Sequence, residues 1–162
     1  MRSQLRFSLL VLALATCAFA AAPEDNLSTK ILTPDLAQQI LGGPVEPAKR
    51  NSGIDIKNGN TVLSQCSYSM KGDAVTPVSI SLFLRRAGTA DEAKTIFLAS
   101  KTTYNGQDVG ALGDAAYRTV APAQLNVLKG KSWLIISAGA FPKADPSLQE
   151  KAAREILKNI QD

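Results

Sequence analysis

Two carboxylates beside a glycine-rich stretch are the side chains with the clearest chemical potential. Asp108 precedes the stretch 110–113 (Gly-Ala-Leu-Gly), and Asp114 directly follows it. If the two carboxylates converge, they could bind a cation or act as the acid and base of glycoside hydrolysis. The spacing is not that of an EF-hand loop, and an aspartate beside a glycine commonly bonds nearby backbone amides in a turn. A metal or enzyme site and a purely structural turn therefore both stay open.

The chain contains no histidine, which limits the reactions that it can catalyse. Imidazole is the usual general base and the commonest metal ligand, so a Ser-His-Asp triad and a histidine-based metalloprotease site are excluded. The sequence also lacks a P-loop, a Rossmann fingerprint and a G-x-S-x-G nucleophile elbow. We therefore expect no catalytic residue, no resident metal and no cofactor. The alternative is a carboxylate-dependent enzyme or metal-binding domain that uses Asp108 and Asp114.

Aromatic residues are the other candidates for a binding site. Tyr104 and Tyr117 lie on either side of the glycine-rich stretch and could bind a ligand there together with the two carboxylates. Tyr68 and Trp133 could line an apolar pocket with them. All four also lie among apolar residues at strand and helix ends, where they would serve as core. The pattern favours core over a pocket.

Cys66 is the only cysteine after Cys17, so the remainder of the chain cannot form an internal disulfide. Strand alternation places Cys66 on the same face as Val62, Tyr68 and Met70. Because free cysteines are often buried, the pattern indicates a small core residue rather than a reactive thiol or an intermolecular disulfide.

The first twenty residues predict export. Arg2 and Arg6 precede the uncharged run 7–19, and Ala18-Phe19-Ala20 is typical of cleavage after Ala20. The apolar run is too short to span a bilayer comfortably. We therefore expect a periplasmic or secreted protein.

A lipid-anchored envelope protein is the alternative to plain secretion. The segment 14–17 (Leu-Ala-Thr-Cys) resembles a lipobox, which would lipidate Cys17, although threonine stands where Gly, Ala or Ser is usual. Contact with a membrane is expected only if Cys17 carries lipid.

Charge excludes one class of partner. The formal charge of +4 falls to +2 when Arg2 and Arg6 are removed, and the other basic residues are scattered among acidic ones. Nucleic-acid binding needs clustered Lys and Arg, so we expect no nucleic-acid partner. The partner would be an envelope protein or a small ligand of unknown identity.

The elements that would position these residues follow from hydrophobic periodicity, caps and turn signals. The length fits a flexible leader over 21–31 and one domain over 32–162. Thr33 and Pro34 begin a helix that Gly42-Gly43 ends, and Thr89 with Glu92 forms a capping box. The expected elements are helices over 34–41, 90–101 and 147–160, and strands over 62–70, 78–86, 115–120, 124–128 and 131–138.

The expected order is thus α-β-β-α-β-β-β-α. Paired strands favour an α+β fold, an antiparallel sheet flanked by about three helices. The strand over 78–86 alternates apolar and polar residues, which indicates one wet face. The run 133–136 is apolar at every position, which indicates a central strand.

The segments 40–45, 66–68, 78–82, 110–117 and 125–130 together resemble the sequence rhythm of small exported bacterial envelope proteins and lipoproteins. Several of these have a PsbP-like fold, and most are of uncharacterised function. The resemblance implies a helix-flanked antiparallel sheet in an envelope setting, and it implies no catalytic residue. The sequence as a whole predicts an exported, non-enzymatic binding or accessory domain that meets its partner through the wet sheet face or the loop over 106–113.

Overall fold

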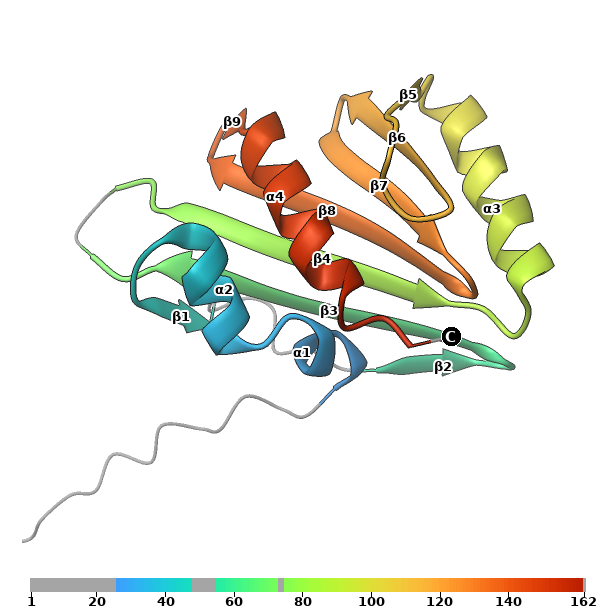
Figure 1. Cartoon of the computed structure of the whole chain (residues 1–162), viewed down its shortest axis with the longest axis horizontal. Coiled ribbons are helices and arrows are strands. Elements are labelled where there is room, and N and C mark those ends of the chain that lie inside the picture. Colours follow the sequence, from blue (N-terminus) through green and yellow to red (C-terminus); the bar gives the residue numbers. More distant parts are fainter. Residues whose placement is uncertain (1–25, 48–54, 73–74, 162) are drawn as a thin grey trace, which may run out of the picture.

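The computed structural model describes residues 26–47, 55–72 and 75–161 (Figure 1). Its elements are α1 (Leu27–Ile31), α2 (Pro34–Leu41), β1 (Val45–Pro47), β2 (Ile56–Asn58), β3 (Thr61–Met70), β4 (Val78–Arg86), α3 (Ala90–Thr103), β5 (Gln107–Asp108), β6 (Ala115–Val120), β7 (Ala123–Lys129), β8 (Ser132–Ala140), β9 (Lys143–Ala144) and α4 (Pro146–Leu157). This confirms the α+β class with an antiparallel sheet. The expected order is not observed, because a further helix, α1, and the short strands β1, β2, β5 and β9 are added to it.

The sheet has the order β1-β3-β4-β8-β7-β6-β5, with β2 pairing with β3 and β9 pairing with β8. The expected hairpin is confirmed, since β3 and β4 pair antiparallel with Cys66 opposite Leu82. The uniformly apolar run in β8 also has the expected place, because β8 lies between β4 and β7 and packs on both of its faces.

The first face of the sheet carries the main core. Alternate residues of β3, β4, β7 and β8 point to this face, where α1, α2 and α4 lie over them (Figure 1). Its fully buried side chains include Tyr68, Ile80, Leu82, Leu84, Leu125, Leu134 and Ile136. Burial of this apolar area is the main source of stability, because the domain has no disulfide.

The second face is divided between α3 and solvent. Phe97 and Ala93 of α3 pack on Tyr117, Leu128 and Trp133, which the pleat directs away from the main core. The Phe97 ring centroid lies 4.8 Å from that of Tyr117 and 6.3 Å from that of Trp133. This second cluster fixes α3 over β7 and β8.

The helix caps largely follow the sequence signals. Thr33 accepts a hydrogen bond from the Leu36 amide at 3.2 Å, and Gly42 ends α2 in the left-handed region, at φ +81°. Thr89 caps α3 through the Glu92 amide. The capping box also predicted that the Glu92 carboxylate accepts a hydrogen bond from the Thr89 amide, and this is wrong. The carboxylate instead accepts from the Gly88 amide and from the Thr61 hydroxyl, which β3 brings close.

Asn26 and the helix α1 belong to the fold, so the expectation of a flexible leader is wrong for residues 26–31. Asn26 caps the helix and is buried, the Ser28 amide donates to Ser64 Oγ at 2.8 Å, and Ile31 joins the core. One helical turn is too short to show a hydrophobic period, so only tertiary contacts with β3 reveal it.

Residues 1–25, with Cys17, the Ala20 cleavage position and the first part of the leader, lie outside the described residues. Among the described helices, none has the length and apolarity needed to cross a membrane.

Cys66 is a core residue, as expected from strand alternation. Only 2% of it is exposed, its Sγ lies 3.9 Å from the Leu32 carbonyl oxygen, and burial raises the pKa of its thiol to about 11. Thiolate is the reactive form, so burial protects this residue both by blocking access to it and by keeping its thiol protonated.

We expect Cys66 to resist a maleimide or disulfide reagent at pH 8 and to react fully after denaturation. Rapid labelling of the folded protein would contradict this, and the labelled fraction can be measured by intact mass.

Candidate functional site

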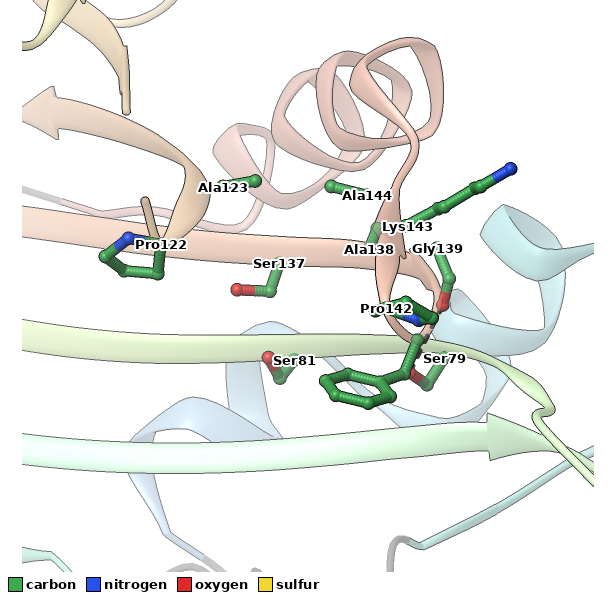
Figure 2. Close-up of a pocket in the computed structure, with 11 residues that line it drawn as sticks. Ser79, Ser81, Pro122, Ala123, Ser137, Ala138, Gly139, Pro142, Lys143 and Ala144 are labelled. Atoms are coloured by element: carbon green, nitrogen blue, oxygen red, sulfur yellow. Dashed lines mark hydrogen bonds between the residues drawn. The ribbon is translucent and has the colours of Figure 1, made fainter. Parts of the chain in front are cut away.

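A groove on the second face, here called the outer groove, lies between two hairpin turns. It has a volume of about 360 Å³. Ser81 of β4 and Ser137 of β8 lie between Pro122, at the turn from β6 to β7, and Pro142, at the turn from β8 to β9 (Figure 2). The groove is therefore floored by the sheet and bounded at each end by a turn.

Strand register explains why hydroxyl groups gather in this groove. Ser67, Ser81 and Ser137 stand directly opposite one another on β3, β4 and β8. Neighbouring strands lie about 4.8 Å apart, so these residues form one polar row across the sheet. Ser79 lies beside the row and contacts the Gly139 carbonyl oxygen at 3.4 Å. The wet face expected from alternation in 78–86 is thus part of the groove.

A second cavity, here called the inner hollow, lies beneath the end of α3 and has a volume of about 150 Å³. Ser100 and Tyr104 come from α3 and its C-cap, Tyr117 and Thr119 from β6, Gln124 and Asn126 from β7, and Trp133 and Ile135 from β8. The lining combines aromatic rings with uncharged polar side chains, as in pockets that bind small molecules.

The outer groove and the inner hollow follow one another along β8. The inner hollow uses Trp133 and Ile135, the outer groove uses Ser137 and Gly139, and Pro122 lines both. Alternate residues of a strand advance about 6.6 Å along one face, so the two cavities lie next to each other along β8.

Two side-chain hydrogen bonds set the shape of the inner hollow. Trp133 Nε1 donates to Asn126 Oδ1 at 3.1 Å, and the Tyr117 hydroxyl donates to Ser100 Oγ at 2.9 Å. Burial raises the pKa of Tyr117, so its phenol stays neutral and keeps its proton for that bond. The packed rings and the bond between Tyr117 and Ser100 therefore join α3 to the sheet, and the bond between Trp133 and Asn126 joins β8 to β7.

A scan against protein-family models, a search of curated proteins and a search of solved structures found no match. The interpretation of the site therefore rests on its geometry.

Of the four predicted site residues, the structure brings the two tyrosines together and leaves the two carboxylates elsewhere. Tyr104 and Tyr117 both line the inner hollow, with Tyr104 half exposed at its edge and Tyr117 fully buried. Neither Asp108 nor Asp114 lines the inner hollow or the outer groove. The tyrosines therefore belong to the candidate site and the carboxylates do not.

Each carboxylate has its own basic partner. Asp108, whose side chain is 80% exposed, pairs with Lys101 at 2.6 Å. Asp114 pairs with Lys129 at 3.2 Å and accepts from the Gly130 amide at 2.7 Å. This amide is the main reason that the pKa of Asp114 is lowered, with Lys129 adding to it.

Asp114 thus stabilises the turn between β7 and β8, which is the structural alternative that the sequence left open. In the described part of the chain, no group of three or more acidic or cysteine side chains is arranged to hold a metal ion.

Sequence reasoning missed the polar residues of β7. Gln124 and Asn126 alternate with Leu125 and Val127, and Asn126 is only 3% exposed. A buried amide in a short apolar strand was the available signal, because buried polar groups need partners. Its significance depends on α3, whose position the strand sequence does not show.

The charged side chains around the two cavities limit the chemistry that these cavities can perform. Among the described residues, the side chains that line the inner hollow are all uncharged, and Lys143 is the only charged side chain along the outer groove. Such a lining can orient a polar ligand and exclude water, but it offers no acid and base pair to move protons.

Proposed function

We propose that this chain is an exported, non-catalytic binding domain of the bacterial cell envelope. Its ligand would be elongated, polar and uncharged, and would lie along β8 in the outer groove and the inner hollow. The observation that carries this proposal is the adjacency of two cavities, which share Pro122, on the sheet face that α3 covers only in part. A groove of this kind offers both contact area and hydrogen-bonding groups.

The lining supports an uncharged ligand. A charged group that enters a cavity loses part of its hydration and is favoured there by a partner of opposite sign. The inner hollow provides none, whereas the hydroxyls of Ser81 and Ser137 can both donate and accept hydrogen bonds. Carboxylate catalysis gains no support, because Asp108 and Asp114 are each engaged by a lysine outside the groove.

Titration of isotope-labelled protein with a panel of soluble neutral oligosaccharides tests this proposal. We expect the backbone amide signals of Ser81, Ser137 and Gly139 to shift on binding. Ser137→Tyr should fill the groove and abolish the shifts. Ser147→Tyr, at an exposed position on α4, is the matched control and should leave them unchanged. Shifts confined to the α4 side of the sheet, or no shift with any member of the panel, would overturn the proposed function.

Export remains a separate part of the proposal and depends on residues 1–20. We expect the mass of the protein recovered from the producing bacterium to begin at Ala21, or at an acylated Cys17 if the lipobox is used. Recovery of uncleaved chain with Met1 from the cytoplasm would overturn it.

A further inference from the structure

We propose that the inner hollow is a subsite for one uncharged six-membered sugar ring of a glycan, and that an oxygen of this ring accepts a hydrogen bond from Asn126 Nδ2. This inference rests on the proposed binding function and specifies its ligand. The remaining sugar rings would follow β8 into the outer groove.

The hydrogen bond from Trp133 fixes the orientation of the Asn126 side-chain amide and leaves the N–H groups of that amide available. The indole N–H of Trp133 can only donate, so the atom of Asn126 that faces it at 3.1 Å must be the oxygen. The Nδ2 group must then point away from the indole. It has no hydrogen-bond partner among the described residues, although Asn126 is 97% buried and lines the inner hollow.

An unpartnered amide in a cavity favours a ligand that completes it. Nδ2 is not among the fully buried polar atoms that lack a partner, so water in the hollow can reach it, and an incoming sugar oxygen would take the place of that water. Gln124, on the same face of β7, adds a second amide to the lining of the hollow. Hydroxyl, ether and acyl-amide oxygens of a sugar are acceptors of the required kind.

Size sets how much of a sugar ring can enter. The inner hollow has a volume of about 150 Å³, and a cavity of ~150 Å³ holds benzene, which is smaller than a hexose with its exocyclic groups. One edge of the ring would therefore enter the hollow, and the rest would lie at its mouth. Sugar rings combine apolar C–H faces with polar edges, and so match a lining in which aromatic rings alternate with amides and hydroxyls.

Exposed aromatic residues occur at both cavities. Tyr104 is 53% exposed beside the inner hollow, and Phe141 is 82% exposed beside the outer groove. Aromatic rings in these places can pack against apolar faces of a ligand. They would cover the apolar faces of successive sugar rings.

Trp133 provides a direct readout, because it is the only tryptophan of the chain. The probes are cellotriose and triacetylchitotriose, which are neutral linear trimers without and with acyl amides, and trigalacturonic acid, which is charged. We expect at least one neutral trimer to shift the side-chain NH₂ signals of Asn126 and to change Trp133 fluorescence. We expect the charged trimer to bind at least about tenfold more weakly.

Asn126→Asp tests the donor itself. The carboxylate can still accept from Trp133 but lacks the N–H groups, so the neutral trimer should bind about tenfold more weakly. Asn58→Asp, on the exposed strand β2, is the matched control and should bind as the wild type does. If Asn126→Asp does not fold, the wild-type Asn126 NH₂ signals still decide the question.

The outcomes separate this inference from the proposed function. Shifts at Ser137 and Gly139 without any change at Asn126 or Trp133 would overturn the subsite and leave the binding groove standing. Equal binding of charged and neutral trimers would also overturn it. No shift in either cavity would overturn both proposals.

Discussion

Alanine at Gly113 is expected to lower the free energy of unfolding by about 2–4 kcal/mol. Gly113 has φ +58°, a left-handed conformation that L-residues with a Cβ adopt at a cost. A Cβ there would also lie 2.3 Å from the Leu128 carbonyl oxygen and 2.8 Å from Val127 Cγ1. That carbonyl accepts the Asp114 amide at 2.8 Å, so relief of the clash would break the bond that leads the chain into β6.

Gly110 gives the matched control in the same loop. A Cβ at Gly110 would have no atom within 4 Å, so Gly110→Ala should change the free energy of unfolding by about 0.5 kcal/mol or less. Denaturant unfolding of both variants measures the difference. Similar losses at the two positions would contradict the prediction. The expected contrast would indicate that Gly113 is needed for the conformation of the loop rather than for contact with a partner.

Phe97→Ala should produce the second large effect, a loss of about 3–5 kcal/mol. Phe97 is 1% exposed and joins α3 to the rings of Tyr117 and Trp133. Its removal leaves a cavity between the helix and the sheet. Tyr117 and Trp133, which line the inner hollow, also lose their contact with the Phe97 ring. We therefore expect a lower midpoint of denaturation and a red shift of Trp133 emission in the folded state.

Phe141→Ala is the paired control that separates stability from binding. Phe141 is 82% exposed beside the outer groove, so its removal should change stability by about 0.5 kcal/mol or less. The same variant should weaken binding of a neutral trimer. A large loss of stability at Phe141, or a Phe97→Ala variant as stable as the wild type, would show that the packing of the second face has been misassigned.

Local signals in the sequence were sufficient for most of the framework. The alternation in 78–86 predicted both the bounds and the buried face of β4, because every second side chain of a strand points to the same side. Thr33 and Gly42 predicted both ends of α2, because the capping groups lie within one turn of the amides and carbonyls that they satisfy. The short strands β1, β5 and β9 and the helix α1 escaped prediction, since two to five residues carry too little periodicity.

The sequence by itself determined the α+β class, the central place of β8, the buried state of Cys66 and the lack of imidazole chemistry. These properties follow from residue type and from spacing along the chain. Only the tertiary structure decided which candidate residues share a site. It paired Tyr117 of β6 with Asn126 of β7, placed α3 so that Tyr104 lines the same hollow, and left Asp108 and Asp114 with their own lysines. That division depends on contacts between elements distant in sequence, which no local pattern of residues encodes.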